Sequence, residues 1–307
     1  MRKIKQFMYK PTAKGYFSGC GGMEIGLMQA GINIIQSLDL DVEATDCMKL
    51  NRHYFSHSVL TADIKDKTVL EQTPTDIIVG TYPCTKYSPI ADIHGTRTGD
   101  DLFLHFFRHI AIEKPEMYIV ENVPGMKKFR VVMEAMTKLP DYYVKVFCPV
   151  DAANWLPQRR KRLILIGTKK PYLINSPTQK KNVPTIKSLL ETNPDVPMPD
   201  YVIKRINGGY RDFPIIIDPE FHNAIAPTCV AHYSKDLSTR LVKDKTSQYG
   251  LRPFSVREYA RLQGFPDDFH FENKRSSYRL IGNAVPVHMG NWIGIEALRY
   301  FNQGHNK

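Results

Sequence analysis

The sequence contains no long apolar run, few cysteines and no internal repeat. No window approaches the roughly 20 apolar residues that a membrane-spanning helix needs. The basic N-terminus also lacks the apolar stretch of about 7–15 residues that a secretory signal carries. The five cysteines lack CxxC spacing, which argues against a disulfide framework and against a zinc site. We therefore expect a protein of the reducing cytosol, with no metal site and no membrane partner.

Positive charge is what the sequence has in excess. The 307 residues carry a net charge of +11, whereas the apolar content of 42% and the charged content of 24% are ordinary for a globular protein. An excess of this size favours a polyanionic partner, first nucleic acid and second an anionic membrane surface. The length suffices for one large α/β domain and a smaller one.

Strand-like apolar segments alternate with helical patterns over the first part of the chain. Near-continuous apolar strands in such alternation predict a doubly wound, mostly parallel α/β sheet with helices on both faces. Two later strands flank a short loop without a helix between them, which predicts an antiparallel hairpin at the edge of the sheet. The predicted strands are 15–17, 32–40, 58–64, 76–80, 117–123, 142–150 and 162–170.

Several predicted helices have clear end signals. One ends at Gly31, which suits a C-terminal cap, and the next begins at Asp41, which suits an N-cap. A third, over 100–114, carries an apolar stripe and stops before Pro115. The segment 281–301 predicts one amphipathic helix that packs back on the large domain.

The composition changes at about Pro171, where Pro, Lys and Asn become frequent and periodicity weakens, as at a domain boundary. We predict that residues 1–170, completed by 276–307, form a Rossmann-like catalytic and cofactor-binding domain. Residues 171–275 are predicted to form a smaller domain of short strands and loops.

A glycine-containing loop joins the first predicted strand to the first helix, where a mononucleotide-binding fold holds its ligand. Gly19 and Gly21 match a dinucleotide fingerprint, but Glu24 stands at its third glycine. Asp39 ends the second strand, where such folds bind a ribose hydroxyl, and Asp63 ends the third, where it can accept from an adenine amino group. The pattern favours an adenosyl cofactor over a nicotinamide dinucleotide. A tight turn that binds no ligand is the alternative.

Cys84 and Glu121 lie at the ends of the next two strands, so they should face the same crevice as the glycine loop. This pair suits methyl transfer to C5 of cytosine. A thiolate adds at C6, an acid at N3 stabilises the charge that accumulates, and the enamine takes the methyl group. A base then removes the C5 proton and the thiol leaves. The alternatives are an inert cysteine and a capping or surface glutamate.

The edge hairpin opens with the sequence QRRKR, residues 158–162. Alternation along an extended segment places Gln158, Arg160 and Arg162 on one face. Arginines so placed can pair with a phosphate or a base carbonyl, and they can lower the pKa of a neighbouring thiol. A solvated basic edge that blocks aggregation is an equal alternative.

Together these motifs resemble those of the DNA (cytosine-5) methyltransferases, and they occur in that family's order. FSGCGG is similar to the family's cofactor loop, DLD and ADI to its ribose and adenine segments, PCTKYS to its nucleophile loop and ENV to its carboxylate motif. QRRKR is similar to its Q-x-R-x-R motif, residues 252–269 to the segment that supports its target-recognition domain, and IGNAV to the segment that completes its cofactor pocket. The resemblance covers nearly all of the chain except about 171–248.

The resemblance implies an S-adenosylmethionine-dependent enzyme that methylates C5 of cytosine in a short double-stranded DNA sequence, on a base rotated out of the duplex. It implies Cys84 as the nucleophile, Glu121 at N3, and Arg160 and Arg162 on the target nucleotide. The other substrate contacts that it implies are Pro83, Ser88, Asn122 and Gln158. The cofactor contacts that it implies are Phe17, Ser18, Gly19, Gly21, Gly22, Asp39, Leu40, Asp63, Ile64, Asn283 and Val285.

It also implies that 171–275 is a target-recognition domain. The same resemblance suggests a monomer that works on DNA in a bacterial cytosol, with a restriction endonuclease as a genetic partner. Two positions depart from the family pattern. Thr85 stands where the family usually has Gln, which concerns how the nucleophile loop closes, and Gly15 stands where it often has an acid, which concerns hydrogen bonding of the cofactor loop.

Three other functions are weighed against this one. A tRNA cytosine-5 methyltransferase is the nearest, because a related branch with these motifs acts on RNA. A nucleic-acid-binding protein with an inactive site is disfavoured by the intact motif residues. A nicotinamide-dependent oxidoreductase is disfavoured because Glu24 replaces a glycine of the dinucleotide loop.

Overall fold

The protein is described from a computed structural model, which covers residues 9–66, 68, 73–83, 102–208, 214–272 and 274–303. The chain divides into two compact units. The first unit comprises Met1–Val150, Lys161–Pro177 and Met289–Lys307, and the second comprises Asp151–Arg160 and Thr178–His288. The division into a catalytic domain of residues 1–170 and 276–307 and a recognition domain of residues 171–275 stays a prediction.

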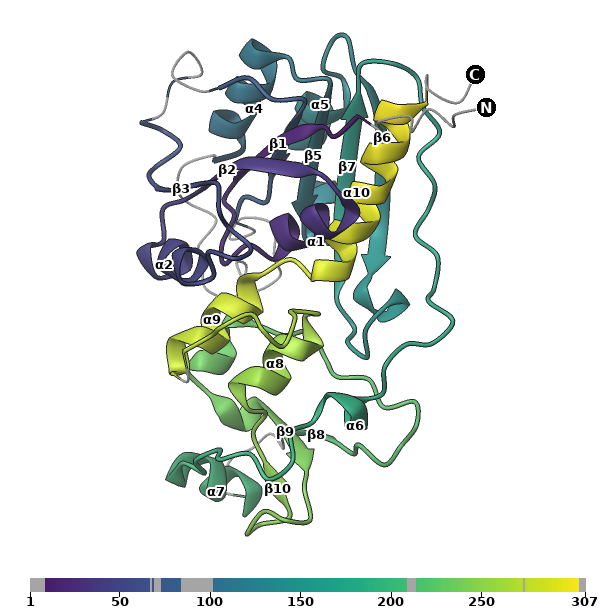
Figure 1. Ribbon diagram of the computed structural model, residues 1–307. Coiled ribbons are helices and arrows are strands. Elements are labelled where there is room, and N and C mark those ends of the chain that lie inside the picture. Colours follow the sequence, from purple (N-terminus) through teal and green to yellow (C-terminus); the bar gives the residue numbers. More distant parts are fainter. Residues whose placement is uncertain are drawn as a thin grey trace, which may run out of the picture. The chain divides into compact units, whose positions relative to one another are not determined.

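A seven-stranded sheet forms the centre of the first unit, with strand order β3-β2-β1-β4-β5-β7-β6 (Figure 1). The five strands from β3 to β5 are parallel, whereas β7 runs antiparallel to β5. The predicted doubly wound sheet with a hairpin at its edge is therefore confirmed. The strands are β1 (Thr12–Tyr16), β2 (Asn33–Asp39), β3 (Ser58–Thr61), β4 (Ile77–Gly80), β5 (Met117–Asn122), β6 (Tyr143–Asp151) and β7 (Lys161–Thr168).

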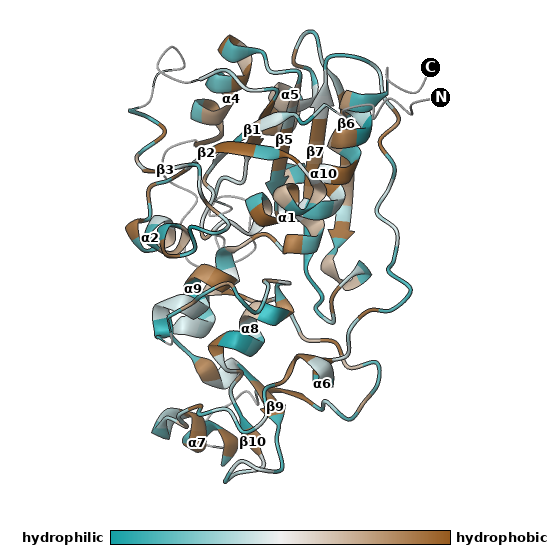
Figure 2. Cartoon of the chain, in the orientation of Figure 1, coloured by the Kyte–Doolittle hydropathy of each residue, from teal (hydrophilic) through white to brown (hydrophobic). Residues whose placement is uncertain are grey.

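Helices cover both faces of this sheet. On one face, α4 and α5 bury Phe103, Phe106 and Val132 in a core that includes Tyr118 of β5. On the other face, α1 packs against α10 so closely that a Cβ on Gly290 would lie 2.6 Å from the Met23 carbonyl oxygen. Figure 2 shows apolar residues along β7 and much of β2. The helical segments are α1 (Gly22–Ala30), α2 (Val42–Leu50), α4 (Leu102–Glu113), η2 (Pro124–Lys128), α5 (Arg130–Thr137), η3 (Ala152–Asn154) and α10 (Val287–Asn302).

The predicted helix ends are confirmed at two positions and corrected at a third. Gly31 has a left-handed φ of 104° and caps α1, while the Asp41 side chain accepts from the backbone N–H of Glu43 at the start of α2. The predicted single helix over 281–301 is wrong, because the chain forms two helices that are separated at Pro286. Proline has no backbone N–H and cannot continue the ladder of helix hydrogen bonds.

The second unit has a small sheet of order β10-β9-β8, in which β8 and β9 are parallel and β9 and β10 antiparallel. Three tyrosines, Tyr233, Tyr259 and Tyr278, pack against one another in its core. A capping box of Ser255 and Glu258 begins α8. The elements are α6 (Ile186–Leu189), α7 (Asp200–Ile206), β8 (Ile215–Ile217), η4 (Ala231–Ser234), η5 (Leu237–Thr239), β9 (Arg240–Lys243), β10 (Leu251–Arg252), α8 (Val256–Leu262) and α9 (Arg275–Asn283).

The described part of the chain contains neither a membrane-spanning helix nor a cluster of metal-ligating side chains. None of its helices is long and apolar enough to cross a membrane. Within the same residues, no three or more His, Cys, Asp and Glu side chains gather in a way that could hold a metal ion.

Candidate active site

The loop between β1 and α1 has the backbone of a ligand-binding turn. Phe17, Gly19 and Gly21 all have left-handed φ angles, of 62°, 56° and 85°. Such a conformation is uncommon for a residue with a side chain, and it is found often at functional sites. A Cβ on Gly19 would meet nothing within 4 Å, so this side of the loop is open. Gly22 begins the helix directly after it.

Asp39, at the end of β2, fixes this loop from the neighbouring strand. One of its carboxylate oxygens accepts from the Gly19 N–H at 2.7 Å and the other from the Asp41 N–H at 2.8 Å. Burial raises the pKa of Asp39, and these N–H groups partly offset that effect. Each carboxylate oxygen can accept a second hydrogen bond, so the carboxylate can still bind a ribose hydroxyl.

The remaining predicted adenine contacts lie next to β2 and β3. Leu40 directly follows β2 and is 64% exposed, an unusual exposure for a leucine. Asp63 is half-buried and accepts from the Lys65 N–H, while Ile64 is buried beside it. An apolar surface at Leu40 and a carboxylate at Asp63 suit the face and the amino group of a purine.

Two buried polar atoms beside the cofactor loop have no hydrogen-bond partner, namely Ser18 Oγ and Glu24 Oε2. They belong to one cluster, because a Cβ on Gly15 would lie 2.8 Å from Ser18 Oγ and 2.2 Å from Glu24 Oε1. Buried polar atoms are rarely left without a partner in folded proteins. The loop therefore fits a ligand that brings a polar group to this place, as the methionine part of S-adenosylmethionine would.

Strand order arranges these groups along one edge of the sheet. Parallel strands present their carboxyl ends at the same edge, and the order β3-β2-β1-β4-β5 places Asp63, Asp39, the β1 loop, the β4 end and Glu121 in sequence. Hydrogen bonds join neighbouring strand ends. The Thr81 hydroxyl donates to the Phe17 carbonyl at 2.7 Å, and the Asn122 amide donates to the Tyr82 carbonyl at 3.0 Å.

Glu121 and Arg162 form an ion pair in the first unit. Arg162 Nε lies 2.8 Å from Glu121 Oε1, and the two side chains are 13% and 9% exposed. Asn122 next to Glu121 holds the chain just before Pro83, which is exposed and is the last described residue before the predicted nucleophile. Cys84 and Ser88, like Thr85, lie outside the described residues.

Gln158 and Arg160 belong to the second unit. Both side chains are buried while Arg159 and Lys161 are exposed, so the alternation predicted for this segment is confirmed. The Arg160 guanidinium donates to the carbonyl oxygens of Cys229, Gly282 and Ala284, at 2.6, 3.1 and 2.9 Å.

The predicted cofactor residue Asn283 ends α9 between the Gly282 and Ala284 carbonyls, and Val285 comes directly after Ala284. Gln158 completes the same network: it donates to Leu262 and Gln263 and accepts from the Cys229 N–H. Gln263 also belongs to this network, although no sequence motif singled it out; its amide donates to the Ile281 and Ala284 carbonyls. The only local sign of this role in the sequence is that Gln263 directly precedes Gly264, at the end of α8.

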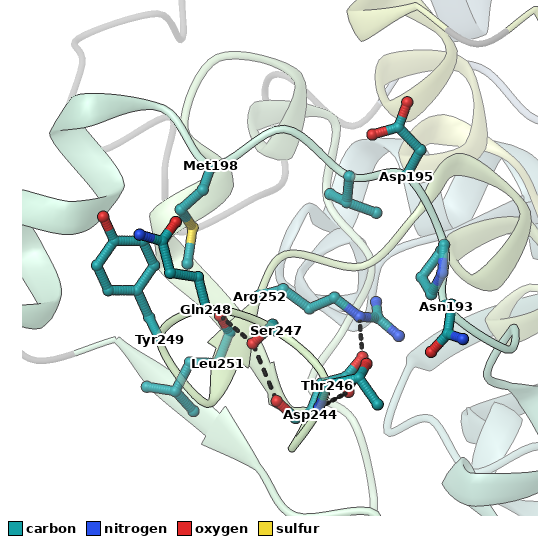
Figure 3. Close-up of a pocket in the computed structure, with 12 residues that line it drawn as sticks. Asn193, Asp195, Met198, Asp244, Thr246, Ser247, Gln248, Tyr249, Leu251 and Arg252 are labelled. Carbon is teal, nitrogen blue, oxygen red and sulfur yellow. Dashed lines mark hydrogen bonds and ion pairs between the residues drawn. The ribbon is translucent and has the colours of Figure 1, made fainter.

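The second unit also contains a cavity of about 380 Å³ between the segment 193–198 and the β9–β10 turn (Figure 3). Arg252 lines it, but its guanidinium is already paired with Asp244 at 2.6 Å and with Glu258 at 2.7 Å. These contacts fix the turn, and the cation is therefore committed to internal carboxylates.

Comparison with known proteins is consistent with this geometry. A family model described as C-5 cytosine-specific DNA methylase matches residues 15–211 and 206–298. The Type II methyltransferase M.Sau96I of Staphylococcus aureus is 27% identical over 99% of this chain and 78% of its own length. M.BsuFI of Bacillus subtilis, also a Type II methyltransferase, is 30% identical over 91% of this chain and 70% of its own length.

Solved structures show the same fold. The Entamoeba histolytica methyltransferase EhMeth superposes with a TM-score of 0.77 at 17% identity, covering 97% of this chain and 100% of its own. A putative DNA modification methyltransferase from an Escherichia coli prophage gives a TM-score of 0.71 at 21% identity, covering 95% and 99%. The family model spans nearly the whole chain, so the chain belongs to the C-5 cytosine-specific DNA methylase family and is an S-adenosylmethionine-dependent DNA cytosine-5 methyltransferase.

Proposed function

We propose that this enzyme methylates one cytosine within a specific short sequence of double-stranded DNA, through covalent addition of Cys84 to C6 of a base rotated out of the duplex. The observation that carries the proposal is the alignment of three neighbouring strand ends. The β1 loop, the β4 end that leads to Cys84, and Glu121 at the end of β5 are joined by the hydrogen bonds from Thr81 and Asn122.

In this proposal Glu121 binds N3 of the target cytosine and stabilises the charge that accumulates when the Cys84 thiolate forms a bond to C6. Arg162 orients the Glu121 carboxylate through their 2.8 Å contact and is assigned to the same target nucleotide. A base then removes the C5 proton, and the bond between Cys84 and C6 breaks to release the thiol. Pro83 and Ser88 are proposed to shape the loop around the flipped base.

The cofactor supplies an electrophilic methyl group when bound. Asp39 would hold the ribose, Asp63 and Ile64 the adenine edge, and Leu40 and Phe17 its faces. The loop residues Ser18, Gly19, Gly21 and Gly22 would hold the methionine part. We assign Asn283 and Val285 to the same cofactor, and Arg160 and Gln158 to the segments that carry them.

We assign target recognition to the smaller domain predicted over 171–275. The exposed turn between β9 and β10 carries Lys245, Gln248 and Tyr249, a combination that suits contact with phosphates and base edges. The Type II methyltransferases among the relatives favour a role beside a restriction endonuclease. We further propose a monomer that works on DNA in the cytosol.

Bisulfite sequencing of host DNA tests this function directly. Cells that express the wild-type protein should contain 5-methylcytosine in one short sequence context, whereas cells that express Cys84→Ala or Glu121→Gln should not. Glu134→Gln, on an exposed position of α5, serves as the control and should methylate like the wild type. Absence of methylation by the wild-type protein contradicts the proposal.

Two further assays separate the alternatives. Methyl incorporation into duplex DNA and into tRNA, measured side by side, distinguishes a DNA enzyme from an RNA enzyme. A duplex that contains 5-fluorocytosine should trap the wild-type protein covalently, because a fluorine at C5 cannot leave as the proton does. A protein with an inactive site forms no such adduct.

A further inference from the structure

Glu24 is a buried acid that takes part in no step of the proposed reaction. Its side chain is in the first turn of α1, the residue is 2% exposed, and Oε2 has no hydrogen-bond partner. Burial raises the pKa of Glu24 to about 7, and the neighbouring Ser18 hydroxyl partly offsets this rise. A buried carboxylate without a compensating partner is costly, so its presence needs a reason.

Two facts place this carboxylate at one end of the cofactor site. Gly15, Ser18 and Glu24 meet in one small space, as the close approaches to a Cβ on Gly15 show. This space lies at the β1 end, one strand away from the ribose position at Asp39 and two strands away from the adenine position at Asp63. The part of the cofactor that extends beyond the ribose, away from the adenine, is the methionine part.

We propose that Ser18 and Glu24 form a relay that binds the α-ammonium group of the cofactor's methionine part. Ser18 is the less buried of the two residues, at 7% exposed against 2% for Glu24. Its hydroxyl accepts from the ammonium and donates to the Glu24 carboxylate. Both orphaned oxygens then have partners, and the buried negative charge balances the positive charge of the ligand. Glu24 is thus a positioning residue that acts through Ser18.

Gly15 is the third member of this arrangement. A side chain at position 15 would begin 2.2 Å from Glu24 Oε1 and 2.8 Å from Ser18 Oγ, so the ends of both side chains would have to move aside. A carboxylate at position 15 would therefore compete with Glu24 for the space beside β1. Moving the carboxylate from position 24 to position 15 is thus a test of the inference.

The experiment compares two ligands that differ only at the methionine end. S-adenosylhomocysteine carries the ammonium group, whereas 5′-methylthioadenosine lacks both it and the carboxylate. Calorimetry should show that Glu24→Gln and Ser18→Ala each lower the affinity for S-adenosylhomocysteine by about tenfold or more, the effect expected for a charge-assisted hydrogen bond. Both substitutions should change the affinity for 5′-methylthioadenosine by no more than about twofold. Equal losses for both ligands, or no loss for either, would overturn the inference.

The transplantation variant is Gly15→Asp combined with Glu24→Ala. It returns a carboxylate to the same space from the other side, although Ser18 Oγ, at 2.8 Å from the added Cβ, has to turn aside. The double variant should therefore recover part of the affinity for S-adenosylhomocysteine that Glu24→Ala loses. Gly15→Asp alone should be less stable to heat, because its side chain collides with Glu24. If the double variant is folded by circular dichroism and binds no better than Glu24→Ala, the charge relay is wrong.

Two further variants complete the design. Glu43→Gln is the matched control, because Glu43 is in the first turn of α2 but is exposed; it should leave both affinities unchanged. The inference rests on the proposed placement of the cofactor, which Asp39→Ala tests separately. That variant should lower the affinity for both ligands. If Asp39→Ala changes neither affinity, the placement of the cofactor is wrong. If Asp39→Ala lowers both affinities but Glu24→Gln changes neither, only the relay is wrong.

Discussion

At Glu24, burial and charge act in opposite directions, and the balance depends on pH. Its raised pKa of about 7 means that the free folded protein holds a proton there which the unfolded chain, with an ordinary pKa of about 4.5, has already lost. Folding stability therefore falls as the pH rises between these two values, and no further loss from this group occurs above about pH 7. Asp39 and Cys20 face the same carboxylate and are themselves shifted upward in pKa by burial.

Ligand affinity should respond to pH with the opposite sign. A bound ammonium favours the ionised carboxylate, so binding below about pH 7 displaces a proton from Glu24. The affinity for S-adenosylhomocysteine should therefore rise from pH 6 to pH 7.5 by a severalfold factor, bounded by about tenfold per pH unit. Calorimetry on the wild type and on Glu24→Gln measures this. An equally steep rise in the variant would assign the pH dependence to another group.

The segment QRRKR shows how one element serves two units. Its residues alternate in exposure, as the extended pattern predicts, but the buried Arg160 and the partly buried Arg162 have different partners. Arg162 pairs with Glu121 in the first unit, whereas Arg160 binds three backbone carbonyls in the second. Those carbonyls flank α9 and η4, whose close contact leaves no room for a side chain at position 282. Arg160 thereby acts as a buried clamp on the segment that carries Asn283.

Replacement of Arg160 should therefore affect stability before chemistry. Arg160→Met removes the guanidinium donor from the buried Cys229 and Gly282 carbonyl oxygens, whereas the Ala284 carbonyl keeps the Gln263 amide. The loss should lower the free energy of unfolding by about 2 kcal/mol or more. Urea denaturation followed by tryptophan fluorescence would measure this change. Arg159→Gln, at the exposed neighbouring position, is the control and should stay within about 0.5 kcal/mol. Equal stabilities of the two variants would contradict the clamp.

On the scale of the whole molecule, the net charge of +11 fits the DNA substrate of the family. Many internal cations are already paired, such as Lys14 with Glu113 at 2.6 Å and Arg252 with two carboxylates. The positive charge that is available to bind a polyanion therefore lies on exposed lysines and arginines. Binding through such groups releases counterions from DNA, which makes affinity depend steeply on salt.

We expect the affinity for duplex DNA to fall at least tenfold between 50 and 200 mM salt, with a linear plot of log affinity against log salt. Fluorescence anisotropy with a labelled duplex measures the slope. Lys245→Gln, in the exposed β9–β10 turn, should make the slope shallower by about one. Lys49→Gln, on α2, where Lys49 is paired with Asp46, should leave it unchanged. A slope that does not change in Lys245→Gln would remove this turn from the DNA interface.

The sequence by itself determined the parallel sheet, the glycine-containing loop after β1 and the strand-end positions of Asp39 and Glu121. These features are encoded locally, by apolar strands, closely spaced glycines and acids at strand ends. The motif order was sufficient for the family, and the family model confirms it.

Only the tertiary structure decided which of these residues meet. Gly15 and Glu24 were separate oddities in the sequence, one a missing acid and the other a missing glycine, and the fold brings them into one space. Arg160 and Arg162 were equivalent by alternation, yet their partners lie far apart in the sequence, at 229–284 and at 121. Contacts across such separations depend on how strands and helices pack, and no local pattern encodes that packing.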